Sequence, residues 1–263
     1  MHIVVCAKQV PDTSEIKIDS KTGSLLREGA PSILNPDDAH ALETALSIKD
    51  TYPDARVTVL TMGPAQAKDV LIEAIAMGAD DGVLVNDSRL AESDTWATAY
   101  ALACAVKKLA PVDLLLTGRQ ASDGVTAQVG PELAEQLDMP QATCVDALES
   151  IEEGGKVQVH VMTDQGHAVM RLPLPALLTV TAEMNKPRYM SMAGIFRKNK
   201  PIQVWNAEEA GIDPDCVGLA ASMTKVIDTY QPPRGRGGRM IPADDTDEAV
   251  AELLVELKEL QTI

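Results

Sequence analysis

The chain has 263 residues, of which 45% are hydrophobic and only 3% aromatic, and its formal net charge is −16 at pH 7. This size and apolar content suffice for one large domain with an extension and a core of aliphatic side chains. The acidic surplus disfavours nucleic acid, which needs Lys and Arg to displace counterions, and it equally disfavours an anionic membrane surface. The longest uncharged apolar stretch, Thr95 to Val106, is too short for a bilayer, so we expect no membrane insertion.

The four cysteines are far apart in the sequence. Cys6, Cys104, Cys144 and Cys216 form no CxxC pair and have no His at ligand spacing. This pattern favours reduced thiols in a cytoplasmic protein and disfavours a metal site. The first residues run directly into a predicted strand, so we expect no secretory signal peptide.

Strands and helices alternate over the first half of the chain. Apolar runs predict strands at 3–7, 57–62, 83–85 and 112–117. Helices are predicted from Pro36 to about Lys49, from Gly63 through Met77, and from a Ser93-Asp94 cap to about Leu109. This alternation predicts an α/β fold, Rossmann-like, with a mainly parallel twisted sheet and helices on both faces. In such sheets, ligands bind beyond the carboxyl ends of the strands.

The pattern changes after Pro140. Segments 157–162 and 168–172 predict an antiparallel pair, 177–181 predicts another strand, and 16–27 predicts a hairpin, so we expect an antiparallel appendage. A basic, Met-rich recognition loop at 185–201 precedes a Gly/Arg/Pro-rich arm at 230–239 and an amphipathic helix at 243–260. We therefore predict an α/β nucleotide-binding domain over 1–225. Residues 226–263 are predicted to form an arm and a helix that packs on a partner subunit or, alternatively, on its own core.

The segment from Gly118 to Glu132 (Gly-Arg-Gln-Ala-Ser-Asp-Gly-Val-Thr-Ala-Gln-Val-Gly-Pro-Glu) carries the strongest functional signal. It connects the strand at 112–117 to a helix predicted at 128–137. Such a loop directs backbone N–H groups and the positive end of a helix dipole at one point, which suits a phosphate. Gly118 and Gly124 would allow close backbone approach or positive φ. The structural alternative makes Asp123 a helix N-cap and Gly124 a turn residue.

Several separated motifs together resemble the β subunit of electron transfer flavoproteins, in the electron-bifurcating form found in anaerobes. They are Val4 to Thr13 (Val-Val-Cys-Ala-Lys-Gln-Val-Pro-Asp-Thr), Asn35-Pro36-Asp37-Asp38, Met62-Gly63-Pro64-Ala65, the Gly118 to Gly130 string, and Asn185-Lys186-Pro187-Arg188-Tyr189-Met190-Ser191-Met192. The resemblance covers nearly the whole chain. One departure is Val125, which stands where the bifurcating pattern has Asp, although its backbone N–H can still serve a phosphate.

The resemblance implies a cofactor crevice built from four segments. Its residues are Cys6, Ala7, Lys8, Asn35, Asp37, Asp38, Met62, Gly118, Arg119, Gln120, Ala121, Ser122, Asp123, Gly124, Val125, Thr126, Ala127, Gln128 and Val129. The implied cofactor is FAD, or AMP in the ordinary form of the family. By the same resemblance, Arg188, Tyr189, Met190 and Met192 dock a dehydrogenase. The structural alternatives are helix-dipole partners for the two aspartates, a turn residue for Asn35 and core residues for the methionines.

The implied function is electron transfer centred on a flavin. FAD in this chain would take a hydride from NADH and send one electron to ferredoxin or flavodoxin. The other electron would pass through the FAD of an electron transfer flavoprotein α subunit to an FAD-dependent dehydrogenase of the acyl-CoA or 2-hydroxy acid type. We find no catalytic triad or acid/base pair, as expected when the cofactor carries the chemistry. Two alternatives are a non-bifurcating β subunit with structural AMP and a stand-alone ATP- or AMP-binding module.

Overall fold

The computed structural model describes residues 1–12, 32–152, 155–228, 240–242 and 245–259. The predicted hairpin at 16–27 and the predicted arm at 230–239 lie outside these residues. Contacts divide the chain into one unit over Met1–Ile227 and a second over Asp228–Ile263. The second unit contains α7 (Thr246–Glu259), which falls within the predicted amphipathic helix and leaves Val250, Leu253 and Leu254 about half exposed.

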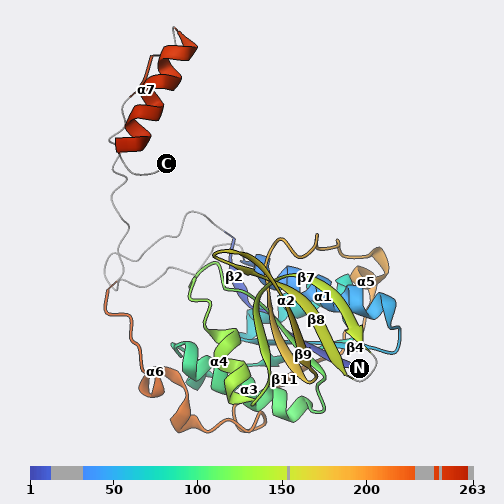
Figure 1. Cartoon of the computed structure of the whole chain (residues 1–263). Helices are drawn as coiled ribbons and strands as arrows, with labels where there is room; N and C mark the ends of the chain where they lie inside the picture. The colour runs from blue at the N-terminus through green and yellow to red at the C-terminus, as the bar shows by residue number, and fades with distance from the viewer. Residues whose placement is uncertain (13–31, 153–154, 229–239, 243–244, 260–263) are drawn as a thin grey trace. The chain divides into compact units, whose positions relative to one another are not determined.

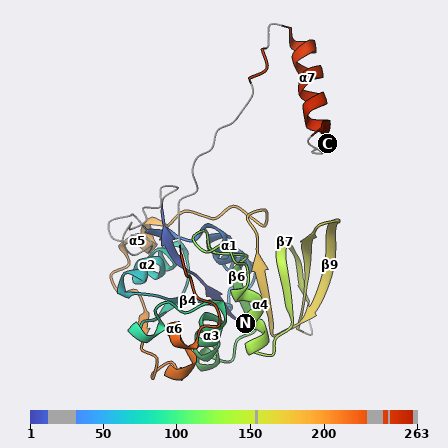
Figure 2. The same ribbon diagram turned by 90° about the vertical axis from the view of Figure 1, so that its left-hand side faces the viewer.

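The first unit is built on one nine-stranded sheet in the order β11-β5-β4-β1-β6-β10-β7-β8-β9 (Figures 1 and 2). The strands are β1 (His2–Cys6), β4 (Arg56–Met62), β5 (Asp81–Val85), β6 (Leu114–Gly118), β7 (Gln141–Glu152), β8 (Lys156–Thr163), β9 (Gly166–Pro173), β10 (Ala176–Val180) and β11 (Ile202–Trp205). Neighbours are parallel from β11 through to β7, whereas β7 with β8 and β8 with β9 are antiparallel. The structure confirms the predicted α/β class. The antiparallel strands form one edge of the main sheet.

Three features of the sheets were not predicted. The hydrophobic pattern did not predict β7, because its residues are mostly half-buried and its pairing with β8 shifts register twice. β11 is a four-residue edge strand whose middle residues are exposed. A second, two-stranded antiparallel sheet joins β2 (Gln9–Pro11) to β3 (Ser32–Leu34).

Helices cover both faces of the sheet. They are α1 (Pro36–Thr51), α2 (Lys68–Met77), α3 (Thr95–Leu109) and α4 (Val129–Gln136), with shorter turns η1 (Ala65–Ala67), η2 (Ser88–Leu90), α5 (Met192–Phe196), η3 (Pro214–Cys216) and α6 (Gly218–Ala221). The predicted cap of α3 is confirmed, because the Asp94 side chain accepts a hydrogen bond from Ala97 N at 3.0 Å. The single helix predicted from Gly63 is instead the short turn η1 followed by α2.

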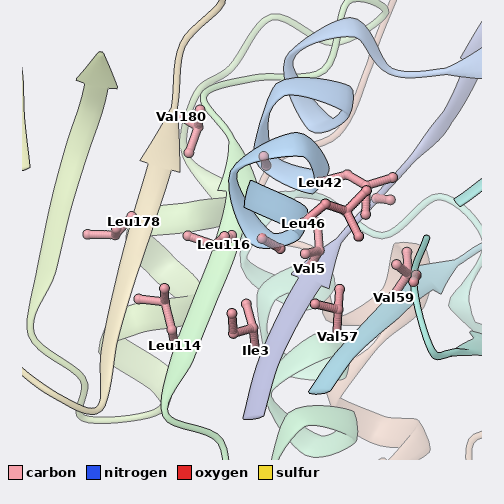
Figure 3. Close-up of a cluster of buried hydrophobic side chains, with 14 of the residues drawn as sticks. Ile3, Val5, Leu42, Leu46, Val57, Val59, Leu114, Leu116, Leu178 and Val180 are labelled. Carbon is pink, nitrogen blue, oxygen red and sulfur yellow. The ribbon is translucent and has the colours of Figure 1, made fainter. Parts of the chain in front are cut away.

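Two apolar layers hold the sheet between the helices. Alternate residues of β1 point to opposite faces, so Ile3 and Val5 pack beneath α1 and α2, while Val4 and Cys6 pack against α3 and α4. Figure 3 shows Leu42 and Leu46 of α1 over the strands. Each fully buried side chain of this size contributes about 1.5–3 kcal/mol. This packing fixes the carboxyl ends of the central strands.

The strand order reverses direction at β1. β4, β5 and β11 lie on one side of it, and β6, β10 and β7 lie on the other. The connections that leave β1 and β6 therefore diverge to opposite sides. In open α/β sheets this switch point is the usual place for a ligand.

Candidate cofactor-binding site

Asp38 joins the two strand ends at the switch point. It lies in the first turn of α1 and is only 7% exposed. Its Oδ2 accepts a hydrogen bond from Lys8 N at 2.7 Å, just after β1, and its Oδ1 accepts one from Gly118 N at 3.0 Å, at the end of β6. One carboxyl group thus sets the spacing between the ends of β1 and β6.

Asn35 braces the loop that follows β6. It occupies the N-cap position of α1, yet its side chain makes no cap bond and turns to the loop. Asn35 Nδ2 donates to Gln120 O at 2.9 Å, and Asn35 Oδ1 accepts from Ser122 N at 3.0 Å. The backbone N–H of Asn35 also donates to Lys8 O at 2.9 Å. Three segments that are distant in the sequence therefore meet at this one buried residue.

Two ion pairs connect the segments that follow β1 and β6 to their neighbours. Lys8 Nζ lies 2.6 Å from Asp123 Oδ1, which gives Asp123 an interaction other than the helix cap that was its structural alternative. Arg119 Nε lies 3.8 Å from Asp37 Oδ2, which is too far for a hydrogen bond. Both atoms are buried, and none of the described residues offers either of them a hydrogen-bond partner.

The loop beyond Asp123 opens into the N-terminus of α4. Thr126, Ala127 and Gln128 are exposed, and Gln128 is the N-cap residue of α4 without a side-chain cap bond. Within the described part of the chain, the N–H groups from Thr126 to Gly130 have no intramolecular acceptor. These N–H groups lie at the positive end of the α4 dipole, where an anion would be favoured.

The two glycines of the loop differ: Gly118 shows the predicted close approach, whereas Gly124 does not. A Cβ on Gly118 would lie 2.4 Å from Asp38 Oδ1 and 2.6 Å from Asp37 C, so this strand end passes α1 at a distance that only glycine permits. A Cβ on Gly124 would meet no atom of the described residues within 4 Å, and Gly124 has no positive φ, which contradicts the prediction of close approach or positive φ there. The positive φ angles fall on Val125 (52°) and Ala127 (54°).

Burial sets the electrostatics of the strand ends. It raises the pKa of Asp38 to about 7, although the hydrogen bonds from Lys8 N and Gly118 N act in the opposite direction. Burial, followed by the nearby Asp38 carboxylate, also raises the pKa of the Cys6 thiol. The Cys6 and Ala7 side chains are buried, so any contact that they make with a ligand is through backbone atoms. Met62, the last residue of β4, packs against the core on the α3 face.

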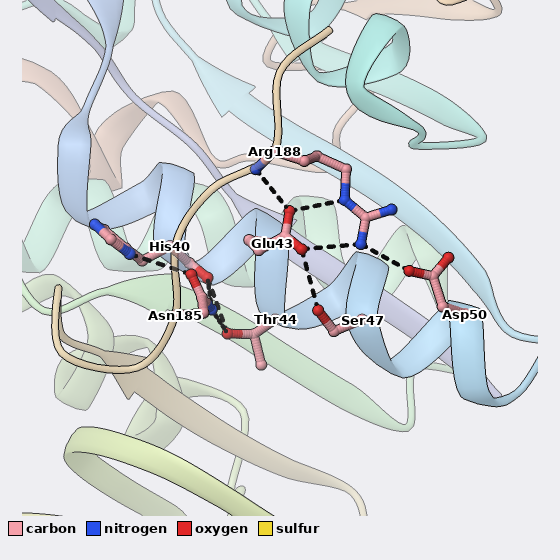
Figure 4. Close-up of polar contacts among 7 residues, drawn as sticks. All are labelled: His40, Glu43, Thr44, Ser47, Asp50, Asn185 and Arg188. Atoms are coloured by element: carbon pink, nitrogen blue, oxygen red, sulfur yellow. Dashed lines mark hydrogen bonds and ion pairs between the residues drawn. The ribbon is translucent and has the colours of Figure 1, made fainter. Parts of the chain in front are cut away.

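The structure separates the proposed docking residues into two kinds. We call residues 185–201 the docking loop. Its Tyr189, Met190 and Met192 are 91%, 46% and 67% exposed. Arg188 points back to α1 instead, where it binds Glu43 and Asp50, each at 2.8 Å (Figure 4).

Glu43 was not predicted to have a functional role, and Asn185 was predicted only as the first residue of the docking loop. Asn185 Nδ2 donates to His40 O and to Thr44 Oγ1, at 3.0 and 2.9 Å. Both contacts, like the Glu43–Arg188 pair, join residues more than 140 positions apart, as the separations of 145 and 141 show. No local pattern signals such a pair. Glu43 could have been singled out only as a carboxylate on the buried side of a predicted helix.

These groups fit a phosphate-bearing nucleotide. The N–H groups at α4 provide anion donors, and Arg119 Nε and Asp37 Oδ2, which face each other without a hydrogen bond, are one further donor and one acceptor. Lys8 adds a half-exposed positive charge. These residues at the ends of β1 and β6 thus combine donors for a phosphate with an acceptor for a hydroxyl group, which are the two needs of a ribose phosphate.

Comparison with known proteins agrees with this geometry. The family model described as "Electron transfer flavoprotein domain" matches residues 22–210. A subunit of Acetobacterium woodii, "Caffeyl-CoA reductase-Etf complex subunit CarD", is 50% identical over 264 residues and 100% of both chains. The "Electron transfer flavoprotein subunit beta" of Clostridium acetobutylicum is 46% identical over 98% of both chains.

A third relative is also similar over its full length. The "Acryloyl-CoA reductase electron transfer subunit gamma" of Anaerotignum propionicum is 40% identical over 100% of both chains. Among the described residues, no helix is both long and apolar enough to cross a membrane. The family match and the full-length similarity lead to one conclusion: this chain belongs to the electron transfer flavoprotein family and takes part in electron transfer.

Proposed function

We propose that this chain is the FAD-binding β subunit of an electron-bifurcating electron transfer flavoprotein. FAD, when bound, would supply the redox chemistry, with NADH as hydride donor and with ferredoxin or flavodoxin and the FAD of the α subunit as electron acceptors. The single observation that carries the proposal is the convergence at the β1/β6 switch point. There Lys8, Asp38 and Gly118 meet the loop that leads to the N-terminus of α4.

The residues of this chain would bind and orient the cofactor. The unpaired N–H groups from Thr126 to Gly130 suit the pyrophosphate, and Lys8 and Arg119 add positive charge to that site. Asn35 and Asp38 would act indirectly, because their polar atoms already hold the loop and the strand ends in place. No residue in this group needs to transfer a proton, since the chemistry belongs to the flavin.

The names of the relatives support the choice of partner. One belongs to a caffeyl-CoA reductase–Etf complex and another to an acryloyl-CoA reductase. We therefore propose an FAD-dependent dehydrogenase of the acyl-CoA type, ahead of the 2-hydroxy acid type. Tyr189, Met190 and Met192 of the docking loop would contact this dehydrogenase, and α7 would pack on the α subunit. We place the protein in the cytoplasm because its four cysteines are free.

The test is a flavin count on the β subunit co-purified with its α subunit, with spectra before and after NADH addition. Two FAD per heterodimer, with rapid bleaching by NADH, is the expected result. One FAD together with released AMP would refute bifurcation, because AMP has no visible spectrum and no redox chemistry. A heterodimer with neither nucleotide in this chain would refute the crevice assignment as well.

A further inference from the structure

The docking loop is fixed to α1 at its beginning. Asn185 binds the backbone and side chain of α1 through His40 O and Thr44 Oγ1, and His40 Nδ1 lies 3.1 Å from Asn185 Oδ1 (Figure 4). Three residues later, Glu43 accepts hydrogen bonds from Arg188 N, Nε and Nη2 at 3.0, 2.8 and 2.9 Å. Ser47 Oγ donates a further bond to the same carboxylate at 3.1 Å. The root of the loop is thus held by a carboxylate that is only 7% exposed.

A second attachment follows at once. Ser191 N and Ser191 Oγ both donate to Ala76 O, near the end of α2, at 3.0 and 3.2 Å. A Cβ on Gly194 would lie 2.3 Å from that same carbonyl oxygen, so α5 packs against α2 too closely for a larger residue at this position. The loop is therefore anchored on two helices, at Arg188 and at Ser191.

Only Tyr189 and Met190 lie between these two anchors. Tyr189 is 91% exposed although it is a large aromatic side chain. Its exposure does not come from a loose loop, because the residues on either side are hydrogen-bonded to helices. An aromatic side chain presented on a fixed backbone loses little further entropy on binding, which is the property of a preorganised contact residue.

The charges identify what this surface fits. The guanidinium of Arg188 is neutralised by Glu43 and by Asp50, so it is not available to a partner. Lys186, Arg197 and Lys198 are exposed, and no described carboxylate pairs with them. The docking loop therefore carries Tyr189 together with three exposed cations, on a chain with a net charge of −16, and this combination is complementary to an apolar pocket with an acidic rim.

We propose that Glu43 is a positioning residue for partner recognition, which holds Arg188 so that Tyr189 stands ready for an apolar pocket with an acidic rim on the dehydrogenase. This role rests on the proposed function. It assigns Arg188 to the internal support of the docking loop and Tyr189 to the contact itself. Glu43 acts only through Arg188 and touches neither cofactor nor partner.

The test compares four heterodimers: wild type, Glu43→Gln, Asp50→Asn and Tyr189→Ala. Hydrogen exchange of the Arg188 amide, which donates to Glu43, reports on the support, and electron transfer to a purified FAD-dependent acyl-CoA dehydrogenase gives KM and kcat. In Glu43→Gln we expect exchange about tenfold faster, the equivalent of one charge-assisted hydrogen bond, and KM raised about fivefold with kcat and flavin content unchanged. Asp50→Asn is the matched control, because the Asp50 side chain is 64% exposed and the Glu43 contacts remain. It should change both values less than about twofold.

A double-variant cycle separates positioning from general damage. Tyr189→Ala should raise KM without faster exchange, and Glu43→Gln combined with Tyr189→Ala should raise KM no further. Additive effects, or fast exchange in Glu43→Gln with unchanged KM, overturn the positioning role. If Glu43→Gln does not fold, Arg188→Lys must show the same rise in KM at constant kcat, since lysine keeps the charge without the paired N–H geometry. A wild-type heterodimer that transfers no electrons to the dehydrogenase refutes the proposed function itself, whereas the exchange data report on the support alone.

Discussion

Replacement of Gly118 by alanine tests the geometry of the crevice most directly. The added Cβ would lie 2.4 Å from Asp38 Oδ1 and 2.6 and 2.7 Å from Asp37 C and Cβ. Two of these three atoms belong to Asp37 at the first turn of α1, and one is backbone, so a rotation of one side chain cannot remove the overlap. The first turn of α1 must therefore move away from the end of β6.

The expected cost has two parts. Overpacking of a filled site destabilises by about 1–3 kcal/mol. The movement also breaks the bond from Gly118 N to Asp38 Oδ1, and a hydrogen bond to a charged group contributes about 1.5–3 kcal/mol. Partial relaxation makes these terms less than additive, so we expect a loss of about 3 kcal/mol in the free energy of unfolding.

Urea unfolding of the heterodimer, followed by circular dichroism, measures this loss. Gly124→Ala is the matched control, because a Cβ there meets no atom within 4 Å in the described part of the chain and the residue has no positive φ. The control should unfold within about 1 kcal/mol of wild type, with a slightly higher midpoint because alanine restricts the unfolded chain. A Gly118→Ala protein as stable as the control would refute the close packing of β6 against α1.

A larger substitution at Gly124 tests cofactor binding. Gly124→Val introduces a β-branched side chain into space that no described atom of the chain occupies. Any effect on flavin content must then arise from the ligand and not from the fold. We expect loss of flavin, measured by absorbance, with an unfolding midpoint in urea equal to that of wild type when both proteins are stripped of flavin, because bound flavin itself would stabilise the wild type. Full retention of flavin would contradict the assignment of this loop.

Three further predictions concern the same site. Val125→Asn should stabilise by about 0.5–1 kcal/mol in thermal unfolding, because a β-branched residue at φ 52° is strained and Asn tolerates that conformation; a lower Tm would contradict this. Burial raises the pKa of Asp38 from 3.8 to about 7, so the folded state keeps this proton longer than the unfolded state does. The stability of wild type relative to Asp38→Asn should therefore fall from about pH 4 to pH 7, and urea midpoints that keep a constant difference over this range would refute the shift. Lys8→Gln removes the positive partner of the Asp123 carboxylate, whose side chain is only 7% exposed, so it should cost about 1–3 kcal/mol in urea and also weaken flavin retention; retention equal to wild type would exclude Lys8 from the cofactor site.

The sequence determined the elements that depend on neighbouring residues. The apolar run predicted at 3–7 is β1 at His2–Cys6, and the run at 112–117 is β6 at Leu114–Gly118. The helices predicted at Pro36 and after Asp94 begin at those points, because proline and a capping carboxylate act within one turn. Local chemistry was also enough to predict the loop after β6 and the helix α4 behind it.

The sequence also indicated which segments could meet, because the carboxyl ends of parallel strands lie at one edge of the sheet. It could not indicate how they meet. The use of Asp38 for two backbone N–H groups depends on Lys8 and Gly118, which are 30 and 80 positions away. The local pattern is equally consistent with a helix-dipole partner that faces solvent.

Only the tertiary structure decided the features that join distant segments. β7 begins parallel to β10 and continues antiparallel to β8, so its residues carry no simple alternation. Arg188 reads in the sequence as part of a basic docking surface, but the approach of α1 to the loop places Glu43 beneath it and turns the guanidinium inward. The physical reason is the same in both cases: hydrophobic periodicity and capping act over a few residues, whereas the partners of a buried charge are set by the packing of the whole sheet.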